Sequence, residues 1–149
     1  MDDAVLLTEF EECTLPLELW THRAHLRVGY MYVRKYGLDA AVERMRSGIQ
    51  RFNAAGQIPE AIDRGYHETV TQAWLRLIST YLADESSDQC SESFLDAHPD
   101  LGDKRVLLQF YSRERIMSWE AKRGFVEPDL APLPVASGFP SDEAGRFSW

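Results

Sequence analysis

The chain has 149 residues, of which 44% are hydrophobic and 11% aromatic, and its formal net charge is −8 at pH 7. This length and apolar content predict a single domain with one substantial core. The negative charge disfavours nucleic acids and anionic membranes as partners, because both would be repelled at long range.

The N-terminal sequence and the cysteines point to a cellular compartment. The chain opens on Met1-Asp2-Asp3 without a basic leader, and no apolar run approaches the roughly 18 residues needed to span a bilayer. Cys13 and Cys90 lack the C-x-x-C spacing and the density of a disulfide framework, which is typical of a reducing compartment. We therefore expect a cytoplasmic protein that does not bind membranes.

The first half of the chain predicts helices separated by Pro and Gly. Residues 4–12 predict a short helix that ends before Pro16, and a long helix then begins near 17–21 and runs to Tyr36. Gly37 supplies the stop, and 38–55 predicts a second long helix with apolar residues every three or four positions. So short a connection predicts an antiparallel helical hairpin.

A third long helix is expected from Tyr66 to about Ala83, after a loop over 56–65. Shorter helical segments are expected after it, at 91–97, at 104–111 and in two turns capped by Ser112 and Ser118. No alternation typical of a strand appears in the sequence. The pattern predicts an all-α, single-domain helical bundle over residues 1–134 and an extended, proline-containing tail over residues 135–149.

The histidines carry the main chemical signal. With His22 at zero on a helical wheel of about 100° per residue, His25 falls near 300°, and both lie in the apolar stripe of the first long helix. Arg23, Arg27 and Arg34 form a separate stripe that is expected to face solvent. His22 and His25 are therefore predicted to face inward, one helical turn apart.

A third histidine, His67, is placed by the same exercise at the centre of the apolar face of the third helix, in its first turn beside Glu68. Two imidazoles from adjacent turns and one from a second helix can complete a three-ligand set for a transition metal such as zinc or iron. Glu68 would then be a fourth ligand or a general base acting on bound water.

The alternative needs no metal. Each of the three histidines can instead donate a hydrogen bond to a helix carbonyl or a tyrosine, with the bundle binding a ligand or a partner in an aromatic groove. Arg113 could hold a substrate carboxylate, with Glu114 as an acid–base neighbour, although surface ion pairs and capping are the more usual explanation of such residues. His98, which precedes a proline, is expected to be a surface or capping residue.

Four segments resemble a family of small uncharacterised bacterial helical proteins. They read WTHRAHL at 20–26, YHETVT at 66–71, HPDL at 98–101 and YSRE at 111–114, and the resemblance spans roughly Phe10 to Pro134. It implies a helical fold and marks these segments as the site without implying an activity. A weaker architectural similarity links the chain to the DinB-like metal-binding bundles, in which a single histidine precedes an H-x-x-x-H pair. Here the pair comes first and its spacing is H-x-x-H.

The leading hypothesis is a small metal-dependent enzyme acting on a small molecule. Its metal ligands would be His22, His25 and His67, and its catalytic or substrate-binding groups would be Glu68, Arg113 and Glu114. The alternative is a metal-free helical module that binds a small-molecule ligand or a protein. The sequence leaves the oligomeric state open.

Overall fold

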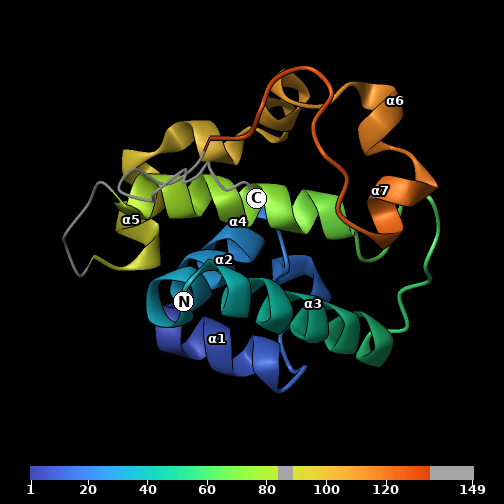
Figure 1. Cartoon of the computed structure of the whole chain (residues 1–149). Helices are drawn as coiled ribbons and strands as arrows, with labels where there is room; N and C mark the ends of the chain where they lie inside the picture. The colour runs from blue at the N-terminus through green and yellow to red at the C-terminus, as the bar shows by residue number, and fades with distance from the viewer. Residues whose placement is uncertain (84–88, 135–149) are drawn as a thin grey trace.

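Helices form the whole framework of this protein. The computed structural model describes residues 1–83 and 89–134, and no strand occurs in these two ranges (Figure 1). The α-helices are α1 (Asp3–Glu11), α2 (His22–Tyr36), α3 (Leu38–Ala55), α4 (Glu68–Ala83), α5 (Ser91–Ala97), α6 (Arg113–Ile116) and α7 (Trp119–Arg123), and the 3-10 helices are η1 (Leu17–Leu19), η2 (Pro99–Gly102) and η3 (Lys104–Gln109). The predicted all-α, single-domain bundle is confirmed. The predicted tail over 135–149 lies outside the described residues.

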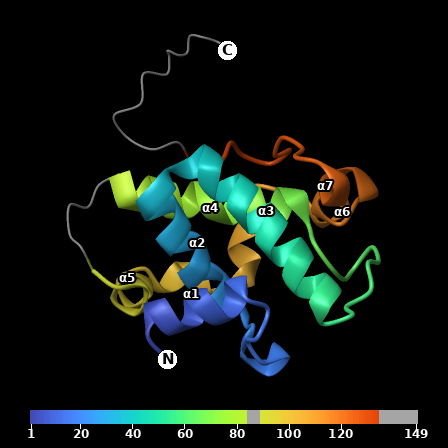
Figure 2. The same cartoon turned by 90° about the horizontal axis from the view of Figure 1, so that it is seen from below.

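Caps and turns in the sequence set the helix boundaries. The Thr21 side chain accepts a hydrogen bond from the N–H of Ala24 at 3.2 Å and so begins α2. Gly37 joins α2 to α3 with a φ of 87°, a conformation that a side chain would strain. Beyond Gly37, α3 turns back from the end of α2 and diverges from it at an angle (Figure 2). Ser112 and Ser118 cap α6 and α7, as predicted.

The longest helices pack on each other around α4. In Figure 1, α4 crosses the middle of the molecule, with α1, α2 and α3 on one side and the segments after α5 on the other. α4 contacts α2, α3 and α7. The fully buried side chains come from both sides of α4, and burial of their apolar surface supplies the main driving force for folding. These side chains include Phe10, Tyr30, Leu75, Ile78, Phe94, Leu101 and Tyr111.

One side chain of α2 is buried against expectation. Arg27, predicted to face solvent, is only 7% exposed because α1 and α5 cover that side of α2. Its guanidinium donates to the Ser91 hydroxyl at 2.8 Å and to an Asp3 carboxylate oxygen at 3.0 Å. Arg23 and Arg34 are exposed as predicted.

Among the helices of the described ranges, none has the length and apolar character that a membrane-spanning helix needs.

Gly29 lets α2 approach α4 closely. A Cβ atom at this position would lie 2.9 Å from Cδ2 of Leu75, a residue that is itself buried in the core. The absence of a side chain at Gly29 therefore makes room for α4.

Gly29→Val is expected to lower the free energy of unfolding by about 2 kcal/mol, because overfilling a packed core forces side chains and backbone apart. Urea denaturation monitored by circular dichroism measures this loss. Lys35→Val introduces the same side chain at an exposed position of the same helix and should cost at most about 0.5 kcal/mol. Equal losses in the two variants would mean that β-branching, and not the contact with Leu75, governs the effect.

Candidate functional site

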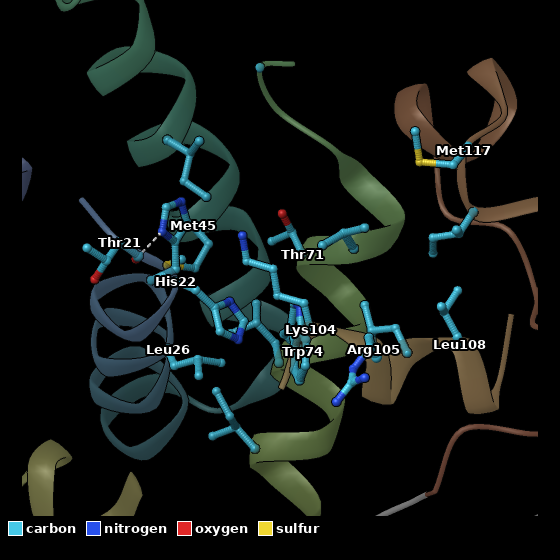
Figure 3. A pocket seen from close by; sticks show the side chains of 18 of the residues that line it. Thr21, His22, Leu26, Met45, Thr71, Trp74, Lys104, Arg105, Leu108 and Met117 are labelled. Carbon is cyan, nitrogen blue, oxygen red and sulfur yellow. Dashed lines mark hydrogen bonds between the residues drawn. The ribbon is translucent and has the colours of Figure 1, made fainter. Parts of the chain in front are cut away.

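A pocket of about 750 Å³ opens between the long helices and the segment that follows α5. Its wall combines side chains from α2, α3, α4, η3 and α6, and most of them are apolar or aromatic. Figure 3 shows that Leu26, Met45 and Trp74 line this space together with Thr71. His22 and His25 both contribute to the same wall.

His22 is fixed by a hydrogen bond to the backbone of η2. Its Nε2–H donates to the carbonyl oxygen of Leu101 at 2.9 Å, and its ring lies 4.8 Å from the ring of Trp74, centroid to centroid. A carbonyl can only accept, so the neutral ring carries its lone pair on Nδ1. Burial lowers the pKa of His22, the Leu101 carbonyl partly opposes this, and the Lys104 charge lowers it further.

His25 is also held in its neutral form. Its Nδ1–H donates to the carbonyl oxygen of Thr21 at 2.7 Å, which leaves Nε2 as the acceptor. Its ring stacks on Trp20 with centroids 3.8 Å apart. Burial is the main cause that lowers the pKa of His25 to about 4, with smaller contributions from His22 and Lys104. At pH 7 the imidazole is therefore uncharged.

His67 lies elsewhere, in a structural role. α4 begins at Glu68, so His67 precedes the helix and does not lie in its first turn as predicted. Its Nδ1 accepts a hydrogen bond from the N–H of Val70 at 3.1 Å, and its Nε2–H donates to the carbonyl oxygen of Ile116 at 2.7 Å. Both ring nitrogens are thus engaged, one in capping α4 and the other in holding α6. Burial lowers the pKa of His67.

Glu68 belongs to an ion-pair network away from the histidine pair. Its two carboxylate oxygens accept from Arg46 at 2.8 and 2.7 Å, from the Tyr66 hydroxyl at 2.9 Å and from the Gln72 amide at 2.6 Å. The side chain does not line the pocket of His22 and His25. The hydrogen bonds from Arg46 are the largest cause that lowers the pKa of Glu68 to about 2, so this carboxylate is a poor proton acceptor.

The other predicted site residues separate as well. Arg113 lines the pocket, whereas its neighbour Glu114 is exposed and does not. Sequence reasoning missed Lys104 and Arg105, which η3 brings to the same wall. The sequence shows two consecutive basic residues after the helix-capping Asp103, but it does not show which helices they face.

The predicted three-histidine metal site is not assembled here. In the parts of the chain that the structure describes, no group of three or more His, Cys, Asp or Glu side chains is arranged so that it could hold a metal ion. A ligand must offer its lone pair to the metal, and the Nδ1 lone pair of His67 is already used by Val70. The donor set therefore does not fit a metal in this arrangement, and the metal-dependent reaction stays a prediction.

Comparison with known proteins adds no further guide. No protein-family model matches the chain, and no curated protein or solved structure is significantly similar to it. The resemblances inferred from short segments therefore stay predictions. Function has to be argued from the chemistry of the pocket, since a helical bundle by itself implies none.

Proposed function

We propose that the protein binds a small organic molecule with a largely apolar body in the pocket beside His22 and His25, and that it does so without a metal ion. The observation that carries this proposal is the pocket itself. Its volume of about 750 Å³ lies within the range typical of small-molecule sites, and most of the surface of its wall is apolar.

The two histidines supply specificity to such a site. Each imidazole uses one N–H to bind a backbone carbonyl, and each keeps one nitrogen lone pair that no described residue uses. Both lone pairs can accept a hydrogen bond from a hydroxyl or N–H group of the ligand. Trp20 and Trp74 add flat aromatic surface on either side of the pair.

The uncharged fluorophore N-phenyl-1-naphthylamine is expected to bind this pocket with micromolar affinity and a strong rise in fluorescence. It combines two aromatic ring systems with one N–H donor, which matches the apolar wall and the imidazole acceptors. Thr71→Trp places an indole in the pocket and should weaken binding at least about tenfold, which corresponds to about 1.4 kcal/mol. Fluorescence titration measures both affinities.

Ser79→Trp is the matched control, because it adds the same side chain to α4 at a half-buried position outside the pocket. Leu108→Trp is a second obstruction of the pocket and serves if Thr71→Trp does not fold, which circular dichroism reports. A probe that does not bind, or that binds all the folded variants equally, would remove the support for the proposal.

A further inference from the structure

The wall of this pocket is positively charged although the chain as a whole is acidic. Lys104 and Arg105 begin η3 and Arg113 begins α6, and all three line the pocket. Asp63 is the one carboxylate residue among its described lining residues. The whole chain carries a formal charge of −8, so the cations are concentrated here against the overall balance.

The three cations differ in how they are paired. The Arg105 guanidinium binds the Asp103 carboxylate through contacts of 3.1 and 3.0 Å. The side chains of Lys104 and Arg113, by contrast, make no hydrogen bond or ion pair within the described parts of the chain. Set against Asp63, these two leave an excess of one positive charge on the wall.

The position of Lys104 links this charge to the histidine pair. In the close-up, its side chain extends between the helix that carries His22 and the helix that carries Thr71 and Trp74 (Figure 3). Burial is the main cause that lowers the pKa of His22 and of His25, and the Lys104 charge lowers both further. Because both imidazoles are neutral, they add no charge of their own beside the Lys104 ammonium group.

We propose that the ligand of this pocket is an amphiphilic organic monoanion, such as an aromatic or aliphatic carboxylic acid. Its apolar body lies against Trp20 and Trp74, and its anionic group lies beside Lys104 and Arg113. This inference rests on the proposed function, since it names the chemical class of the ligand for the same pocket. A monoanion matches the single excess charge, and a carboxylate can accept charge-assisted hydrogen bonds from the Lys104 ammonium and Arg113 guanidinium groups.

The test compares two probes that differ by one charged group. 8-Anilinonaphthalene-1-sulfonate carries a sulfonate on the same ring system as the uncharged N-phenyl-1-naphthylamine. The anionic probe is expected to bind about tenfold more tightly at low salt, and this advantage should shrink as salt is added. Lys104→Gln and Arg113→Gln should each weaken binding of the anionic probe severalfold, while binding of the uncharged probe changes less than about twofold.

Lys35→Gln removes one positive charge from an exposed site outside the pocket and is the matched control. If both probes bind equally well, lose affinity in Thr71→Trp and ignore Lys104→Gln and Arg113→Gln, the anionic class is overturned while the proposed function stands. If neither probe responds to the obstruction of the pocket, the proposed function fails, and this inference fails with it.

Discussion

Glu68→Ala is expected to lower the free energy of unfolding by about 3 kcal/mol, because it removes one partner from a buried ion pair. Glu68 is only 6% exposed, and its carboxylate accepts four hydrogen bonds, two of them from Arg46. Without it, the Tyr66 hydroxyl loses its acceptor. Arg46 is 38% exposed and can turn to water, which keeps the loss below the upper end for such pairs. Urea denaturation at pH 7 measures the loss.

Glu114→Ala is the matched control, since Glu114 is exposed and the loss should stay within about 0.5 kcal/mol. Probe binding distinguishes a structural role of Glu68 from a role in the ligand site. A folded Glu68→Ala protein should bind N-phenyl-1-naphthylamine as the unmodified protein does, because Glu68 does not line that pocket. If the variant kept its stability but lost probe binding, Glu68 would be a site residue, as the sequence had suggested.

The fold could be predicted because its signals are local. Gly37 stops α2 through its own backbone conformation, and Ser112 and Ser118 begin α6 and α7 through hydrogen bonds that reach only three residues ahead. Such signals depend on neighbours in the sequence and are readable without a tertiary structure. The same holds for the inward face of α2, which carries His22 and His25 into the pocket.

The site could be predicted only in part, because it depends on how helices are placed against each other. A helical wheel puts Arg27 on a polar stripe, but it cannot show that α1 and α5 cover that stripe. Likewise, His67 and Glu68 are adjacent in sequence, yet one caps α4 towards Ile116 and the other pairs with Arg46 of α3. Neither the partners nor the separation from His22 is encoded in one helix.

Lys104 is a pocket residue that the sequence alone did not predict. It stands 79 residues or more after His22 and His25 in the chain, in a short 3-10 helix with little amphipathic pattern of its own. Only the tertiary arrangement brings its ammonium group to the wall that the histidines line. A charged residue in a short connecting segment is ordinarily read as a solvated surface group, so the cationic wall could not be inferred before the helices were placed.

Stability is expected to fall by about 2 kcal/mol between pH 7.5 and pH 5 through His25 alone. Burial holds the pKa of His25 at about 4 in the folded protein, against 6.5 for an ordinary histidine. The unfolded chain therefore binds a proton first as the pH falls, and stability is lost progressively from about pH 6.5 towards pH 4. Burial also lowers the pKa of His22 and His67, which adds loss of the same sign. Urea denaturation at several pH values measures the curve.

His25→Gln should flatten this curve, because glutamine does not titrate. Carboxylates with a lowered pKa, such as Glu68, lose their stabilising contribution only below about pH 4.5, so they do not obscure the comparison above pH 5. Adding zinc separates the two hypotheses for the histidines. Neutral pocket residues predict no recovery at pH 6, whereas metal ligands predict that zinc restores stability by binding the folded state. An identical pH dependence in the variant would show that His25 is not held neutral by the fold, and a zinc-dependent recovery would favour the metal-dependent enzyme over the metal-free pocket.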